Sequence, residues 1–128
     1  MAAHQPLILI VDDNLDAREM YGMYLAHSGF RWVEAVNGQD AITQTATERP
    51  ALILMDATMP SMDGWEATRL LKKDPFTKGI PLVMLTAHAF QEHRDKALEA
   101  GADGFLAKPV LPDDLVREIR RVLKLPAP

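Results

Sequence analysis

The amino-acid sequence predicts an α/β fold in which five parallel strands alternate with five helices, a (βα)5 doubly wound three-layer sandwich. Five short apolar runs recur along the chain, each followed by a polar or small-residue break and then by a segment with helical periodicity. Most of these runs lack polar alternation, which is typical of strands covered on both faces, as in a parallel sheet. Parallel strands need crossover helices, and these pack on both faces of the sheet.

The five apolar runs define the predicted strands, which are Leu7–Val11, Trp32–Val36, Ala51–Met55, Ile80–Leu85 and Gly104–Ala107. The second is the least apolar because Glu34 interrupts it and Arg31 precedes it, so we expect an edge strand. A strand order of 2-1-3-4-5 would place it at an edge, and the preference for right-handed crossovers restricts the topology further. In such a sheet, ligands bind beyond the carboxyl ends of the strands, where the winding reverses between strands 1 and 3.

The segments between the strands have the periodicity of amphipathic helices. The apolar stripe of the first comprises Ala17, Met20, Tyr21 and Tyr24. Ser28-Gly29 supplies a stop for this helix, and Gly101 follows the fourth helix as a C-terminal glycine. Pro75 and Gly79 close the third helix.

The last helix opens with the acidic pair Asp113-Asp114, at the end where helices favour negative charge. Its apolar side is formed by Leu115, Val116, Ile119, Val122 and Leu123. Its other side is basic and carries Arg117, Arg120, Arg121 and Lys124. A basic face of this kind is usually solvated, and it is also a candidate surface for a partner.

The composition fits one domain with one core, since the chain has 128 residues, of which 48% are hydrophobic and 25% charged. The absence of cysteine excludes disulfides, thiolate catalysis and Cys-ligated metal sites. A formal charge of −4 argues against binding nucleic acid through the net field. No apolar run approaches the roughly 20 residues of a membrane span, and Met1–Pro6 lacks the basic residues of a signal peptide. We therefore expect a cytoplasmic single domain over residues 1–128, with a core of about residues 6–124 and a tail or linker start at 125–128.

Polar side chains stand at the carboxyl ends of four predicted strands. Asp12 and Asp13 follow the first strand, Asp56 the third, Thr86 the fourth and Lys108 the fifth. Each has an ordinary explanation when taken alone: a helix cap, a turn residue, a strand-end hydroxyl or a solvated lysine. Together, however, three carboxylates at one rim repel one another, because two charges 4 Å apart cost roughly 4 kcal/mol at an effective dielectric near 20. Such a cluster indicates a bound cation, to which Lys108 contributes one charge and a hard divalent ion would contribute the rest.

Magnesium suits this cluster better than zinc or calcium, because the ligands on offer are few and are oxygen atoms. A metal ion, a lysine and a threonine hydroxyl around one carboxylate are suited to stabilising a phosphoryl group during transfer. Asp56 would then be the nucleophile and would form an acyl phosphate.

With these residues in view, the chain resembles the receiver domain of two-component response regulators, over about residues 6 to 124. The resemblance rests on four motifs in order, Val11-Asp12-Asp13-Asn14, Leu54–Gly64, Leu85-Thr86-Ala87 and Lys108-Pro109. It implies a flavodoxin-like fold with the strand order 2-1-3-4-5, so the expected order does not rest on the weak second strand alone. It also implies that Asp13 and Asp56 bind Mg²⁺ directly with the backbone carbonyl of Thr58, while Asp12 acts mainly through water.

For the switch, the resemblance implies that Lys108 pairs with Asp56 before the reaction and with the phosphoryl oxygens after it. Thr86 would move to hydrogen-bond the phosphoryl group. Phe105 occupies the position of the aromatic switch residue of receivers, although as a strand residue it could equally be part of the core. A cis Lys108-Pro109 bond is implied as well. His88 lies near the expected mouth of the site, where a solvated histidine is the simpler interpretation.

The expected function is that of a signalling switch that catalyses only its own phosphorylation and dephosphorylation. A phosphohistidine on a sensor histidine kinase or a phosphotransfer protein would donate to Asp56. Phosphorylation would bias a two-state equilibrium and alter the face formed by helix 4, strand 5 and helix 5, which would bind a downstream effector of unknown identity. No direct contact with nucleic acid or membrane is expected, and a homodimer formed on phosphorylation is left open.

Three other functions are weighed against this one. An aspartyl-phosphate phosphatase would need a second Asp two residues after the nucleophile, where this chain has Thr58. A nucleotide- or flavin-binding module would need a Gly/Ser/Thr-rich loop after strand 1, where Asp12 and Asp13 would repel phosphate. A receiver-like interaction module that works without phosphate is opposed only by the retention of every reactive group.

Overall fold

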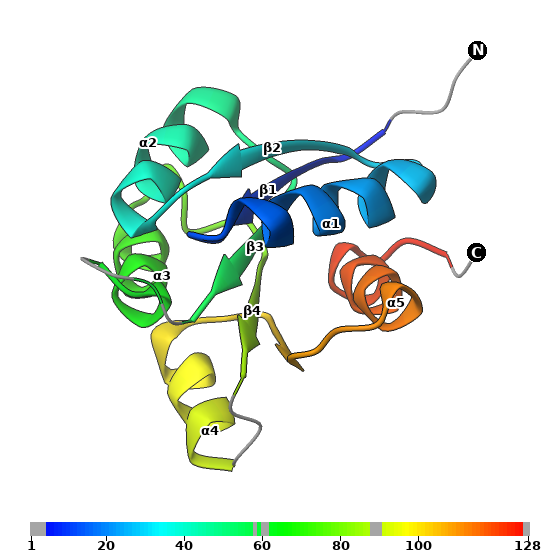
Figure 1. Ribbon diagram of the computed structural model, residues 1–128. Coiled ribbons are helices and arrows are strands. Elements are labelled where there is room, and N and C mark those ends of the chain that lie inside the picture. The colour runs from blue at the N-terminus through cyan, green and yellow to red at the C-terminus, as the bar shows by residue number, and fades with distance from the viewer. Residues whose placement is uncertain (1–4, 58, 60–61, 88–90, 127–128) are drawn as a thin grey trace.

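The computed structural model describes residues 5–57, 59, 62–87 and 91–126, apart from the side chains of residues 91–93. Strands and helices alternate along this part of the chain (Figure 1). In order they are β1 (Leu7–Val11), α1 (Leu15–His27), β2 (Arg31–Ala35), α2 (Gly38–Glu48), β3 (Leu52–Asp56), α3 (Gly64–Lys73), β4 (Leu82–Thr86), α4 (Gln91–Ala100), β5 (Gly104–Ala107) and α5 (Pro112–Leu123). The predicted (βα)5 architecture is confirmed.

All of these strands are parallel and form one sheet in the order β2-β1-β3-β4-β5. β2 is therefore an edge strand, as its interrupted apolar pattern predicted. The bounds of β1 and β5 are the predicted ones, whereas the three middle strands are displaced by one or two residues. β3 and β4 extend to Asp56 and Thr86 because backbone pairing continues through these polar residues. β4 begins only at Leu82, since Pro81 has no N–H to donate to the ladder.

The sheet is covered on both faces, and each face has its own core. α1 and α5 lie on one face, and α2, α3 and α4 lie on the other (Figure 1). The strand residues packed under α1 and α5 are Ile8, Ile10, Leu52, Leu54, Val83 and Leu85. Those on the opposite face are Leu9, Val11, Ile53, Met55, Leu82 and Met84. Because successive side chains of a strand point to opposite faces, each central strand contributes alternately to the two cores.

The buried stripe of α1 differs from the predicted one. It consists of Arg18, Tyr21, Gly22 and Leu25, whereas Met20 is 39% exposed. The reason lies in β2: a Cβ atom on Gly22 would be 2.4 Å from ring atoms of Trp32, so the helix packs here through its glycine. Asn14, rather than an aspartate, caps the helix, and its side chain accepts a hydrogen bond from the N–H of Ala17 at 2.8 Å.

The ends of the other helices follow the expected signals. α3 ends at Lys73, two residues before Pro75, and Gly101 follows α4 with a φ of +102°. Trp65, at the start of α3, is only 6% exposed and belongs to the core on the α2–α3–α4 face.

The apolar side of α5 is confirmed, with Leu115, Val116 and Ile119 buried. Leu125, two residues after α5, also packs against this core. Among the described residues, no helix has the length and apolar character needed to cross a membrane.

Candidate functional site

Three carboxylates come together at the carboxyl ends of β1 and β3. Asp12 and Asp13 directly follow β1, and Asp56 is the last residue of β3, which pairs with β1. One oxygen from each carboxylate can be chosen so that all three lie within 4.8 Å of one another. Asp12 and Asp56 are 2% and 5% exposed, while Asp13 is open to solvent. The predicted acidic cluster is thus present, and it has two buried walls and one accessible side.

Lys108 places a positive charge among these carboxylates and is hydrogen-bonded to two of them. Its Nζ lies 3.1 Å from Oδ1 of Asp56 and 3.4 Å from Oδ2 of Asp12. Its backbone N–H donates to the carbonyl of Thr86 at 2.7 Å, which ties the residue to the end of β4. The following Lys108-Pro109 bond is cis, as the resemblance implied.

Burial disfavours the ammonium form of Lys108, but the attraction of Asp56 and Asp12 outweighs it and raises the pKa of Lys108 above its ordinary value. Lys108 therefore stays charged at neutral pH. One ammonium against three carboxylates leaves the pocket net negative. This excess negative charge, from oxygen ligands only, fits a hard divalent cation such as Mg²⁺.

Backbone contacts fix the position of Asp12. Its N–H donates to the carbonyl of Ala35 at 3.2 Å, and its Oδ1 accepts from the N–H of Asn14 at 2.9 Å. Its own carbonyl accepts from Nη1 of Arg18 at 2.9 Å. Asp12 therefore has little freedom to move within the pocket.

A close approach of two backbones fixes Asp56 from the other side. The N–H of Gly64, the first residue of α3, donates to the carbonyl of Ala57 at 2.9 Å. A Cβ atom on Gly64 would lie 2.1 Å from the carbonyl oxygen of Asp56. Only glycine allows α3 to begin this close to the end of β3.

Thr86 and Phe105 lie on the β4 and β5 side of the pocket. Thr86 is 1% exposed and pairs with Ala107 at the end of β4. Phe105 is half-buried against the α2–α3–α4 core, and the guanidinium carbon of Arg94 lies 5.4 Å from the centre of its ring. Its N–H donates to Oε2 of Glu118 at 3.3 Å, which connects β5 to α5.

The structure does not describe two residues of the predicted site. Thr58, the expected carbonyl ligand, and His88, near the expected mouth, lie outside the described residues. Three further residues contribute to the pocket without having been predicted from the sequence, namely Arg18, Tyr21 and Gly64. Only Gly64 carried a recognisable signal, because it closes the Leu54–Gly64 motif.

Tyr21 is a buried phenol on α1, 3% exposed, in the core under the pocket. Burial raises the pKa of Tyr21, the charge of Lys108 acts in the opposite direction, and Asp12 and Asp56 raise it further. These effects place the phenol within electrostatic reach of the pocket.

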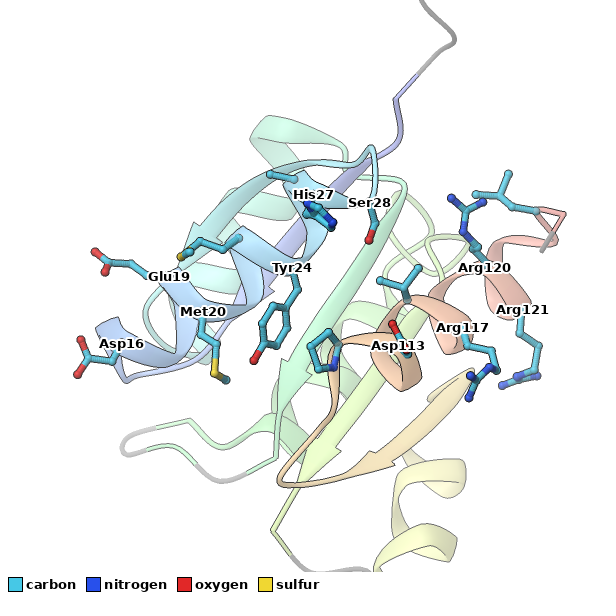
Figure 2. Close-up of a pocket in the computed structure, with 15 residues that line it drawn as sticks. Asp16, Glu19, Met20, Tyr24, His27, Ser28, Asp113, Arg117, Arg120 and Arg121 are labelled. Carbon is cyan, nitrogen blue, oxygen red and sulfur yellow. The ribbon is translucent and has the colours of Figure 1, made fainter. Parts of the chain in front are cut away.

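A second hollow lies away from the carboxylates, between α1 and α5, and has a volume of about 1470 Å³. Figure 2 shows Tyr24 between the two helices in this groove and side chains of both helices along its walls. The acidic residues Asp16 and Glu19 line it on α1, and Arg117, Arg120 and Arg121 line it on α5. None of the pocket carboxylates lines it. Two of the basic residues have partners on their own helix, since Arg117 pairs with Asp114 and Arg121 with Glu118.

Comparison with known proteins identifies a family to which the chain is similar. The family model described as response regulator receiver domain matches residues 8–120. Among curated proteins, the phosphate regulon transcriptional regulatory protein PhoB of Pseudomonas aeruginosa is 40% identical over 121 residues, which cover 94% of this chain and 53% of that protein. The chain thus spans about half the length of this curated relative.

Solved structures agree with this match. The chemotaxis protein CheY4 of Vibrio cholerae superposes with a TM-score of 0.88 at 29% identity, covering 93% of this chain and 99% of that one. The receiver domain of the sensor histidine kinase PA1611 of Pseudomonas aeruginosa superposes with a TM-score of 0.86 at 31% identity, covering 94% and 99%. That structure has a magnesium ion coordinated in its active site cleft.

Proposed function

Because the chain belongs to the family of response regulator receiver domains, we propose that it is a switch phosphorylated on Asp56 in a Mg²⁺-dependent reaction. The observation that carries the proposal is the arrangement of Asp12, Asp13 and Asp56 within 4.8 Å of one another, with Nζ of Lys108 3.1 Å from Asp56. A carboxylate nucleophile, a cation site and a fixed ammonium are the components that phosphoryl transfer requires.

In the proposed reaction, a carboxylate oxygen of Asp56 attacks the phosphorus of a phosphohistidine. A P–O bond forms to give the acyl phosphate, the P–N bond breaks, and its electron pair stays on the imidazole nitrogen of the donor. Lys108 is already hydrogen-bonded to Asp56 and would transfer this contact to a phosphoryl oxygen. Hydrolysis by water would return Asp56 to the carboxylate and reset the switch.

Asp13 and Asp56 are the residues that would hold the metal ion directly, with Asp12 acting through water and the carbonyl of Thr58 as an expected further ligand. The bound ion would supply charge neutralisation for the transferring phosphoryl group. The three carboxylates fit such an ion because they form an oxygen-only, net negative site with one accessible side.

The proposed output is a change in the face made by α4, β5 and α5. Thr86, at the end of β4, would approach the phosphoryl group, and Phe105 would repack in response. The half-buried position of Phe105, beneath Arg94 and bonded through its N–H to Glu118, supports a link between α4, β5 and α5. The same packing is expected if Phe105 is only a core residue. We therefore propose the switch role of Phe105 together with the phosphorylation of Asp56.

We further propose that the phosphodonor is a sensor histidine kinase or a phosphotransfer protein in the cytoplasm, and that one receiver domain occupies residues 1–128. The proposed downstream effector is a protein or domain that binds the altered face. A second copy of this chain could bind there, which would give a homodimer on phosphorylation. The alternative function, a receiver-like interaction module that works without phosphate, makes the opposite prediction in the experiment below.

The test is the mass of the intact protein after incubation with Mg²⁺ and a small-molecule phosphodonor such as acetyl phosphate. We expect a gain of one phosphoryl group, lost when EDTA replaces Mg²⁺ and absent in Asp56→Asn. Asp16→Asn, which removes an exposed carboxylate on the first turn of α1, is the matched control and should be phosphorylated like the parent. An unmodified parent protein, or equal labelling of Asp56→Asn, would overturn the proposed function.

A further inference from the structure

Arg18 is a charged residue in a place where charge is costly. It lies on the buried side of α1, and its side chain is only 10% exposed. Removing a guanidinium from water without partners is strongly unfavourable, so a buried arginine needs its hydrogen-bond donors satisfied. The contacts of Arg18 therefore indicate what this side chain is held for.

Those contacts run in two directions. Nε of Arg18 lies 2.5 Å from Oε1 of Glu34, which is on the edge strand β2. Nη1 donates to the backbone carbonyl of Asp12 at 2.9 Å, in a hydrogen bond that is itself buried. The guanidinium thus connects α1, β2 and the first residue after β1.

The carbonyl of Asp12 lies just beyond regular strand pairing. The pairing of β1 ends at Val11, which is opposite Ala35 on one side and Met55 on the other. Asp12 is 2% exposed, so its carbonyl needs a donor from the protein. Arg18 provides that donor, while the N–H of Asn14 and Nζ of Lys108 donate to the carboxylate of Asp12.

From these contacts we infer that Arg18 is a positioning residue for the acidic pocket: it holds the Asp12 backbone, and Glu34 holds Arg18. With that backbone fixed, the carboxylates of Asp12 and Asp13 are presented together toward a divalent cation. The inference rests on the proposed function, since it assigns Arg18 to the same site.

The action of Arg18 is geometric and not electrostatic. Its charge is balanced by Glu34 at 2.5 Å, so the pair adds little net field at the carboxylates. A planar guanidinium can donate along two fixed directions at once, which the ammonium of lysine reproduces poorly. Supporting residues of this kind, one step removed from the metal ligands, typically change metal affinity by about 10- to 100-fold when they are removed.

The test measures Mg²⁺ binding by titration calorimetry with MgCl₂ on the full chain, at a temperature where circular dichroism shows each variant to be folded. Arg18→Met should weaken Mg²⁺ binding about tenfold, and Arg18→Lys should weaken it by a smaller factor. Arg31→Met makes the same substitution at an exposed arginine of β2, which pairs with Leu7 at the end of the sheet away from Asp12. It is the matched control and should bind Mg²⁺ within about twofold of the parent.

A second measurement separates positioning from a purely structural role. The Mg²⁺ concentration that gives half-maximal phosphorylation should rise for Arg18→Met, while the rate at saturating Mg²⁺ stays close to that of the parent. A loss of thermal stability with unchanged Mg²⁺ affinity would show that Arg18 only supports the fold. If Arg18→Met does not fold, Arg18→Lys decides the question alone, and parental affinity in it overturns the inference.

Failure of this inference can be told apart from failure of the proposed function. A parent protein that binds Mg²⁺ and is phosphorylated, with Arg18 variants that bind equally well, overturns only the positioning role. Weakening by Arg31→Met equal to that by Arg18→Met would show that the effect is not specific to Arg18 and would overturn it too. A parent protein that binds no Mg²⁺ overturns both.

Discussion

Asp13 differs from the other two carboxylates of the pocket in that it is exposed and has the least compensation. Asp12 and Asp56 each lie within hydrogen-bonding reach of Lys108, and Asp12 is also bonded to the N–H of Asn14. Repulsion among the three carboxylates is therefore relieved mainly by neutralising Asp13 or by adding a cation.

Asp13→Asn should accordingly stabilise the metal-free protein by up to about 1 kcal/mol, a value reduced from the buried-pair estimate because the side chain is solvated. The same substitution should weaken Mg²⁺ binding. Urea unfolding with and without MgCl₂ measures both effects. Glu99→Gln, an exposed position at the C-terminal end of α4, is the control and should change neither. A lower stability of Asp13→Asn without Mg²⁺ would contradict the repulsion argument.

The buried phenol of Tyr21 makes the stability of the folded protein depend on pH in the alkaline range. Burial raises the pKa of its phenol above 10.0, so the folded protein holds this proton more tightly than the unfolded chain does. The stability linked to it is fully present below pH 10 and is lost as pH rises through the higher pKa of the folded state. Lys108 acts in the same direction, from an unfolded value of 10.5.

Tyr21→Phe should therefore lose less stability than the parent as pH rises above about 10. Urea midpoints followed by circular dichroism at several pH values measure the difference. Met23→Leu changes an exposed side chain of the same helix that carries no titratable group, and it should follow the parent's pH profile. Parallel profiles for Tyr21→Phe and the parent would show that Tyr21 does not contribute to alkaline unfolding.

At the level of single residues, the sequence was informative where a side chain follows a strand. The positions of Asp12, Asp13, Asp56 and Lys108 were predictable because the carboxyl ends of parallel strands meet at one rim. Arg18 was not, since its role depends on the distance to a backbone carbonyl six residues earlier, and periodicity alone assigns that side of α1 to apolar residues. Only the folded chain brings Glu34 to it.

At the level of elements, the junction between β3 and α3 is the tightest part of the site. The carbonyl of Asp56 and the first residue of α3 approach so closely that a methyl group on Gly64 has no space. The neighbouring atoms are backbone, so relief would require α3 to move away from the strand that carries the phosphoacceptor. The glycine thus couples helix packing to the geometry of the site.

Gly64→Ala should destabilise the protein by roughly 1–3 kcal/mol through overpacking, and it should slow phosphorylation of Asp56. Thermal unfolding and the intact-mass assay measure the two effects. Gly79→Ala is the matched control, because a Cβ there meets nothing within 4 Å. It should leave phosphorylation unchanged and stabilise by about 0.4–1 kcal/mol through the unfolded chain. Equal stability of the two variants would show that the junction can relax.

Among the elements, strands were predicted better than helix faces. Apolar runs located each strand to within two residues, since burial on both faces leaves a continuous signal. The buried side of α1 was displaced because Trp32, on a different element, occupies the space over Gly22. Such a contact between β2 and α1 has no signature in the periodicity of either segment.

For the whole molecule, the two faces of the sheet have separate cores, and the acidic pocket lies between them at the carboxyl ends of β1 and β3. α1 and α5 leave an open groove on one face, while Phe105 and Arg94 lie on the other. The fold and its strand order were predictable from the alternation of runs and from the family resemblance. The groove was not, because it depends on how far apart two amphipathic helices lie.

The N-termini of the helices lie at one end of the sheet. α1, α3 and α5 each begin a few residues after the carboxyl end of the preceding strand, at the rim that carries the carboxylates. The macrodipole of a helix places partial positive charge at its N-terminus. The winding of the sheet therefore directs helix N-termini toward the rim at which the proposed phosphoryl group would add negative charge, and it does so independently of any side chain.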